Sequence, residues 1–213
     1  VNMETLYIFK EFFNKTLGSY NIESRSEHTY LNPNKRENYL FNSKINGIEE
    51  ADFIFLIGSN PRYEATILNA RIRKSNLQNK TKIISLNNVG DLTYPYEALD
   101  GNIKNIKEIT EDNHRISKLI KEAKKPLVIF GQSALRSNSA KYLFESVKSF
   151  LIKNNKISNE WNSLNVISEN ASTVGSFDLG LYKTQDGLNE ILKDLEKNKF
   201  EILYLLGQDN LKF

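Results

Sequence analysis

The amino-acid sequence predicts an α/β fold that is Rossmann-like, with a mostly parallel sheet flanked by helices. Short runs of apolar residues without polar alternation occur at residues 53–57, 127–130 and 202–206, and a further predicted strand at 82–86 is rich in apolar residues. Continuous runs of this kind are typical of strands buried on both faces of a parallel sheet. Segments with helical spacing of apolar residues lie between most of these runs, and alternating strands and helices favour a parallel sheet.

Composition excludes several classes of site. The 213 residues include no cysteine and only two histidines, His28 and His114, which lie far apart in sequence. Disulfides, thiolate nucleophiles and all-cysteine iron–sulfur clusters are therefore excluded from the sequence. We expect neither a metal site nor a cofactor in this chain.

Charge and hydropathy argue against two kinds of partner. The net charge is only +3, and the basic residues at 71–74 are interrupted by an apolar residue, whereas nucleic-acid binding usually requires a basic face. No apolar run approaches the roughly 20 residues of a membrane helix. We expect no nucleic-acid partner and no direct membrane insertion.

The first 50 residues are predicted to form an N-terminal helix and a docking arm. Apolar residues recur at helical spacing through residues 4–17, and Gly18 is expected to end that helix. Residues 21–38 are polar and rich in turn formers, which is typical of a loop or arm.

Residues 51–213 are predicted to form the Rossmann-like domain, as part of a larger domain divided between chains. The expected elements, in chain order, are a strand at 53–57, a helix from Pro61 through Ile72, a strand at 82–86, a loop at 91–101, a helix at 112–124, a strand at 127–130, a helix at 138–152, a helix at 186–197 and a strand at 202–206. Trp161, in a polar stretch, is either a core residue or an interface anchor.

Three of the predicted strands end in the same way. A glycine and a small polar residue follow each of them, at Gly58-Ser59, Gly131-Gln132 and Gly207-Gln208. Ligands of open α/β sheets bind beyond the carboxyl ends of strands, where free backbone amides can hold phosphate. Spacing alone favours the simpler interpretation, in which glycine only turns a strand into a loop.

No group of residues has the pattern of a catalytic site. Ser59 and Ser133 follow strands but lack the flanking glycines of a nucleophile elbow. His114 lies in the polar first turn of a predicted helix, where a helix-end role is expected, and Glu64 fits the preference for acids in a first turn. We therefore predict no catalytic residue.

One long, ordered set of motifs resembles a known family. The set contains Asn38-Tyr39-Leu40-Phe41-Asn42-Ser43-Lys44-Ile45, Gly47-Ile48-Glu49-Glu50-Ala51-Asp52, Gly58-Ser59-Asn60-Pro61-Arg62-Tyr63-Glu64-Ala65, Leu68-Asn69-Ala70-Arg71-Ile72-Arg73-Lys74, Asp91-Leu92-Thr93-Tyr94, Glu122-Ala123-Lys124-Lys125-Pro126-Leu127-Val128, Gly131-Gln132-Ser133-Ala134-Leu135 and Leu205-Leu206-Gly207-Gln208-Asp209. Over residues 5–209 the chain resembles the middle of the large iron–sulfur subunit of respiratory complex I, NADH:ubiquinone oxidoreductase.

The resemblance implies a fold similar to molybdopterin-dependent oxidoreductases. In those enzymes a Gly-x-Asn-Pro loop, here Gly58-Ser59-Asn60-Pro61, helps to hold a pterin dinucleotide. The complex I relatives keep the fold but are not known to use that cofactor, so these four residues are candidates for a vestigial cofactor loop.

The resemblance also implies a function and partners. We expect a structural, non-catalytic part of the complex I peripheral arm that supports electron transfer from NADH to ubiquinone, on the matrix side of the mitochondrial inner membrane. The expected partners are a cluster-bearing N-terminal fragment of a split subunit, which holds the iron–sulfur clusters, and other peripheral-arm subunits. The alternatives are a molybdopterin-binding fragment of an active oxidoreductase and a stand-alone nucleotide-binding module.

Overall fold

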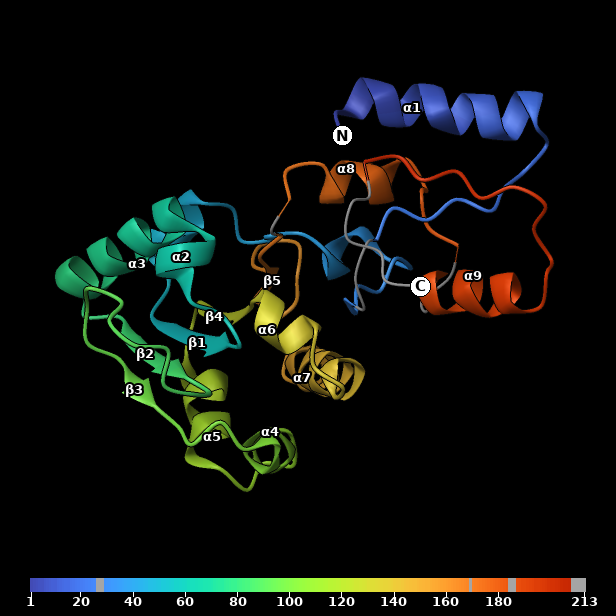
Figure 1. Cartoon of the computed structure of the whole chain (residues 1–213). Helices are drawn as coiled ribbons and strands as arrows, with labels where there is room; N and C mark the ends of the chain where they lie inside the picture. The colour runs from blue at the N-terminus through green and yellow to red at the C-terminus, as the bar shows by residue number, and fades with distance from the viewer. Residues whose placement is uncertain (26–28, 169, 184–186, 208–213) are drawn as a thin grey trace.

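The structure is a computed structural model that describes residues 1–25, 29–168, 170–183 and 187–207. Its centre is a five-stranded sheet in the order β3-β2-β1-β4-β5 (Figure 1). The strands are β1 (Phe53–Ile57), β2 (Lys82–Ser85), β3 (Glu97–Ala98), β4 (Pro126–Phe130) and β5 (Leu164–Val166). All four pairings are parallel. The predicted Rossmann-like α/β fold is confirmed.

The position of the central strand β1 explains why its sequence is apolar without interruption. Phe55 lies in register with Ile84 of β2 on one side and Val128 of β4 on the other. Every residue of β1 is buried, because helices cover both faces of the sheet. Successive side chains of a strand point to opposite faces, so each face receives its own apolar set.

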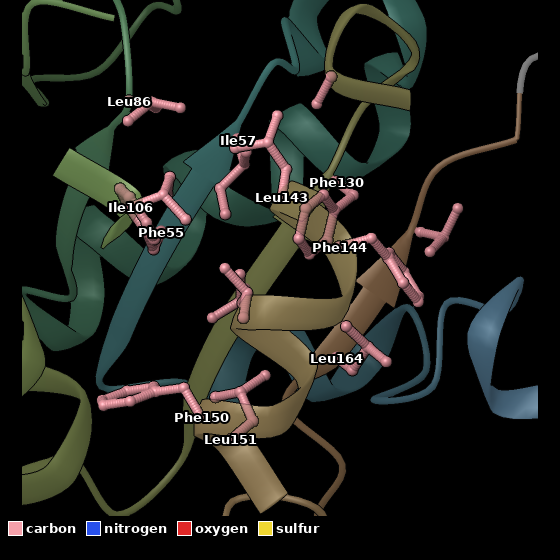
Figure 2. Packing of buried hydrophobic residues seen from close by; sticks show 14 of the residues in the cluster. Phe55, Ile57, Leu86, Ile106, Phe130, Leu143, Phe144, Phe150, Leu151 and Leu164 are labelled. Atoms are coloured by element: carbon pink, nitrogen blue, oxygen red, sulfur yellow. The ribbon is translucent and has the colours of Figure 1, made fainter. Parts of the chain in front are cut away.

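One face of the sheet packs against three helices. Phe53, Phe55 and Ile57 belong to a core cluster with side chains from α4 (Ile103–Thr110), α5 (Arg115–Glu122) and α7 (Ala140–Lys153). Figure 2 shows Phe144 of α7 beside Phe130, with Phe150 and Leu151 toward the other end of the same helix. Leu143, Val147, Phe150 and Leu151 of the apolar face of α7 are buried, whereas Tyr142 is 44% exposed.

The opposite face of the sheet packs against a second cluster. Ile54 and Leu56 contact side chains that include Ile72 of α3 (Thr66–Asn79) and Ile48 of η3 (Asn46–Glu50). Two short helices follow the central strands: α2 (Pro61–Glu64) comes after β1 and α6 (Gln132–Leu135) comes after β4.

The N-terminal helix lies apart from the sheet. The helix α1 (Met3–Glu11) continues as a π-helical segment, η1 (Phe12–Thr16), and Gly18 then has a φ of +63°. In Figure 1, α1 lies beside α8 (Thr173–Asp178), and α9 (Gly187–Glu196) lies farther along the same side of the molecule. The predicted helix over residues 4–17 is confirmed in place, although its last turn is wider than an α-helix.

The segment between α1 and β1 packs onto the α/β domain. Leu31 and Tyr39 are buried in the first core cluster, and η2 (Arg36–Asn38) lies between them. Phe41 forms an antiparallel bridge with Asn165 of β5. A domain boundary at residue 50 stays a prediction, but the second half of the predicted arm shares the core of the sheet.

The predicted strand at 202–206 is wrong. These residues form no strand, and the Ile202 side chain is 84% exposed. An apolar run becomes a strand only where a neighbouring strand supplies hydrogen-bond partners, and none of the described strands lies beside it. The following Gln208 and Asp209 lie outside the described residues.

Several short elements were not predicted. The segment at 91–101 contains β3 rather than only a loop, and the helix expected at 112–124 begins later, at Arg115. The helices α4 and α8 and the strand β5 arise from segments of at most eight residues, which gives periodicity little to detect. No helix among the described residues is long and apolar enough to cross a membrane.

The packing of Phe55 makes it a sensitive test of the fold. Replacement of Phe55 by Ala, which removes a 1% exposed ring from the central strand, should lower the free energy of unfolding by about 3–5 kcal/mol. Ile67→Ala, at a 66% exposed side chain of α3, should change it by less than about 0.5 kcal/mol. Urea unfolding of both variants measures this, and equal losses would contradict the described core.

Candidate functional site

The candidate site lies beyond the carboxyl ends of β1 and β4. From β1 the sheet extends through β2 to β3 in one direction, and from β4 it extends to β5 in the other. In open α/β sheets, ligands bind at this reversal of strand order. The predicted loop Gly58-Ser59-Asn60-Pro61 follows β1, and Gly131-Gln132 follows β4, so the structure brings two of the three predicted glycine motifs together.

The two loops touch one another. Gly58 has a φ of +58°, and a Cβ atom on it would lie 2.6 Å from the Cβ atom of Ala134 in α6. A Cβ atom on Gly131 would lie 2.5 Å from the Cβ atom of Ser59. The backbone amide of Gly131 donates to the carbonyl of Ile57 at 3.0 Å. Both glycines are therefore used for close packing of one loop on the other.

Asn60 ends the first loop as a helix cap. Its Oδ1 atom accepts a hydrogen bond from the amide of Arg62 at 3.1 Å, and Pro61 occupies the first position of α2. Its Nδ2 atom donates to the carbonyl of Val89 at 2.8 Å, which ties the loop after β1 to the loop after β2. The interpretation of Gly58-Ser59-Asn60-Pro61 as a turn with a capping Asn60 fits this geometry.

Glu64 occupies the position between the two loops where an anion would bind. Its carboxylate accepts hydrogen bonds from the backbone amide of Asn60 at 2.8 Å and from that of Gln132 at 3.4 Å. Amides at the starts of helices that follow strands are the groups that hold phosphate in nucleotide-binding sheets. Here both amides already have an internal carboxylate partner.

The role of Glu64 was only partly predicted. The sequence places an acid in the first turn of α2, where acids are preferred, but Glu64 lies one residue beyond the capping-box position relative to Asn60. The second contact, to Gln132, joins residues 68 positions apart in sequence. That contact could not be inferred before β1 and β4 were known to be neighbours.

Two more side chains complete the surroundings of the loops. The Nε2 atom of Gln132 donates to the carbonyl of Ile167 at 2.7 Å, just beyond β5. Arg62 binds Asp91 at 2.6 Å on the exposed side of α2. The pKa of Asp91 is lowered, first by the backbone amide of Thr93 and further by Arg62. Both contacts lie at the outer side of the two loops and hold the loops in their closed arrangement.

One feature is favourable to a ligand. Ser59 is 1% exposed, and its hydroxyl oxygen has no hydrogen-bond partner among the described residues. An unsatisfied buried hydroxyl costs about 1–3 kcal/mol. The backbone of Gly131 packs directly on Ser59, however, so the closed loops leave little room beside that hydroxyl.

The other predicted candidates lie elsewhere. Gly207 does not end a strand, so it is not part of the crevice. His114 caps α5, and its Nδ1 atom accepts from the amide of Ile116 at 3.2 Å, as expected for a helix-end role. His28 lies outside the described residues. The half-buried Trp161 packs against the second core cluster and donates to the carbonyl of Pro126 at 2.9 Å, contacts that fit the core alternative.

Comparison with known proteins assigns the fold to a family. The family model described as molybdopterin oxidoreductase matches residues 1–213. The chain belongs to the molybdopterin oxidoreductase family. Among the described residues of this family member, no group of three or more histidine, aspartate or glutamate side chains could hold a metal ion.

Individual relatives are named as parts of NADH-ubiquinone oxidoreductase or NADH dehydrogenase. The chain is 34% identical to the NADH-ubiquinone oxidoreductase 75 kDa subunit of Reclinomonas americana, over 100% of the chain and 32% of the relative. It is 33% identical to the mitochondrial NADH dehydrogenase [ubiquinone] iron-sulfur protein 1 of Solanum tuberosum, over 98% of the chain and 27% of the relative. The mitochondrial NADH-ubiquinone oxidoreductase 78 kDa subunit of Candida albicans is 35% identical, over 99% of the chain and 28% of the relative. The chain thus spans about a third of the length of the relatives it matches.

The residues at the candidate site do not fit the pterin dinucleotide that gives the molybdopterin oxidoreductase family its name. A phosphate at the switch point would have to displace the Glu64 carboxylate from two backbone amides. It would also have to separate Gly58 and Gly131 from the chain segments packed against them. Negative charge on Glu64 would oppose a phosphate at this distance.

The loop contact can be tested with two glycines of similar backbone conformation. Gly18 has a φ of +63° and open space around it. Gly18→Ala should therefore lower the free energy of unfolding by about 1–2 kcal/mol, through the strain of a left-handed backbone alone. Gly58→Ala should lower the free energy of unfolding by about 1–3 kcal/mol more than Gly18→Ala, because Ala134 must also move to make room for the new methyl group. Chemical unfolding compares the two, and equal costs would mean that the loops are apart in solution.

The cap at Asn60 gives a second test. Asn60→Ala removes the cap oxygen and the bond to Val89, and should lower the free energy of unfolding by about 2 kcal/mol. Asn60→Ser keeps a cap oxygen without adding charge and loses the bond to Val89, so about 1 kcal/mol is expected. Thermal and urea unfolding distinguish them. Equal losses for the two variants would contradict the cap that Asn60 forms on the amide of Arg62.

Proposed function

We propose that this chain is a structural part of the peripheral arm of respiratory complex I and has no redox centre of its own. The family assignment and the names of the relatives support membership of an NADH:ubiquinone oxidoreductase. The observation that carries the structural role is the closed switch point, where Glu64 already takes the amides that a phosphate would need.

The chemistry of the chain agrees with a supporting role. An electron-transfer subunit needs ligands for iron–sulfur clusters or another cofactor, and the sequence has no cysteine. The iron–sulfur clusters would therefore belong to a partner, the cluster-bearing N-terminal fragment of the same subunit. Other peripheral-arm subunits would contact the remaining surface.

The location follows from the same proposal. The relatives from Solanum tuberosum and Candida albicans are named as mitochondrial. A complex I peripheral arm lies on the matrix side of the inner membrane, so we place this chain there. The abundance of Asn, Lys and Ile, which AT-rich codons specify, agrees with an organellar gene.

A second candidate function rests on the buried hydroxyl of Ser59. If that hydroxyl donates to a bound pterin or nucleotide, the chain is a cofactor-binding fragment of an active oxidoreductase. Binding would require Glu64 to leave its two amides. The internal contacts of Glu64 and the two glycines favour the structural role.

Isolation of the chain from its source distinguishes the two functions. We expect it to be recovered in a large complex that oxidises NADH, together with polypeptide whose sequence corresponds to the unmatched two thirds of the relatives. Purified away from that complex, it should contain neither iron nor molybdenum by elemental analysis and should not oxidise NADH. Stoichiometric molybdenum in the separated chain would contradict the structural role.

A further inference from the structure

Met3 carries the only sulfur atom of this chain. The 213 residues include one methionine and no cysteine, and sulfur atoms of these two residue types are common sites of oxidation in proteins. Any oxidation of sulfur in this chain is therefore confined to one position, which is the first residue of α1.

The sulfur of Met3 lies directly against the backbone of α8. A Cβ atom added to Gly175 would lie 2.4 Å from Sδ and 2.6 Å from Cε of Met3. Glycine is the residue that lets another group approach the backbone this closely. The start of α1 thus rests on α8 through an apolar contact between a thioether and a glycine.

This contact matters because α1 is otherwise lightly packed. The helix has nine residues, and none of them is buried. A helix of this length is marginal in water unless tertiary packing supports it. The Ser172 hydroxyl donates to the carbonyl of Val1 at 2.7 Å beside the Met3 contact, and the rings of Phe9 and Tyr204 lie 5.3 Å apart farther along. The order of α1 therefore depends on a small set of contacts that includes Met3.

The Met3 side chain can also be reached from solvent. It is half-buried, and together with Glu4, Tyr7, Ile8 and Leu179 it lines a shallow groove at the surface. The groove lies between α1 and α8, which are side by side in Figure 1. A small oxidant can therefore meet the sulfur while the chain is folded.

We propose that Met3 is a reversible oxidation site whose sulfoxide loosens α1 from α8. In the reaction a sulfur lone pair attacks one oxygen of a peroxide, the O–O bond breaks and an S–O bond forms. The attacked oxygen passes its proton to the departing hydroxide, which leaves as water. The thioether is thus oxidised to the sulfoxide by two electrons, and hydrogen peroxide is reduced to water. Methionine sulfoxide reductases carry out the reverse conversion.

The sulfoxide fits poorly where the thioether lies. Oxidation turns a flexible apolar side chain into a polar one. An oxygen directed toward Gly175 would meet the backbone of α8. An oxygen directed into the groove would lie beside Ile8 and Leu179 and near the Glu4 carboxylate, which when ionised has no proton to donate. The oxidised side chain is therefore better solvated away from α8, and α1 loses the contact.

Dilute hydrogen peroxide applied to the full chain tests this proposal. Peptide mass spectrometry should place one added oxygen atom on Met3. Hydrogen exchange of the α1 amides should then become about five- to tenfold faster, because that factor corresponds to losing part of the burial of one methionine side chain. Amides of α7, which packs on the sheet, should keep their rates. Treatment with methionine sulfoxide reductases should restore slow exchange in α1.

Two substitutions at the same position serve as controls. Met3→Leu keeps an apolar side chain of similar volume and has no sulfur. Its α1 amides should exchange within about twofold of those in the unchanged chain, both before and after peroxide. Met3→Gln places a polar group at the contact and should speed the exchange of α1 without peroxide.

Three results would overturn the oxidation site. Unchanged exchange of α1 in a chain fully oxidised at Met3 would show that α8 accommodates the sulfoxide. Equal acceleration by peroxide in the Met3→Leu chain would place the effect at another residue. Resistance of Met3 to peroxide that oxidises free methionine would show that the sulfur is covered in solution. All three leave the proposed function intact, because neither the family assignment nor the closed switch point involves Met3.

Discussion

The contact between the loops after β1 and β4 determines how the carboxyl edge of this sheet is built. Gly58 and Gly131 let two backbone segments approach more closely than side chains would allow. The Glu64 carboxylate accepts hydrogen bonds from the backbone amides of Asn60, at the cap of α2, and Gln132, at the start of α6. The starts of α2 and α6 are held together by this one carboxylate. In open α/β sheets a ligand crevice usually lies at the reversal of strand order. In this chain the loops after β1 and β4 pack against each other at that place.

The same contact depends on the core below it. The loops meet because β1 and β4 are adjacent, and these strands are adjacent because each is apolar on both faces and can be buried only at the centre of the sheet. The helices α4, α5 and α7 cover one face, while α3 and η3 cover the other. Hydrophobic packing on both faces of the sheet therefore holds β1 and β4 side by side, and with them the two loops.

The exposed apolar residues are distributed unevenly, which agrees with a structural role within an assembly. The sheet domain buries its apolar strands almost completely, whereas α1 and the residues around Tyr204 keep theirs at the surface. A folded domain gains stability from covering such side chains.

The sequence by itself determined the fold class, the strands β1, β2 and β4, and the capping roles of Asn60 and His114. These features depend on periodicity and on neighbours within four residues, which a sequence displays directly. Tertiary structure alone decided three others. It placed Gly58 against Ala134, it brought Glu64 to Gln132, and it left the apolar run at 202–206 outside the sheet. The physical reason is the same in each case: an apolar run or a glycine specifies what can be buried or approached, but which segment becomes its neighbour depends on pairings between distant parts of the chain.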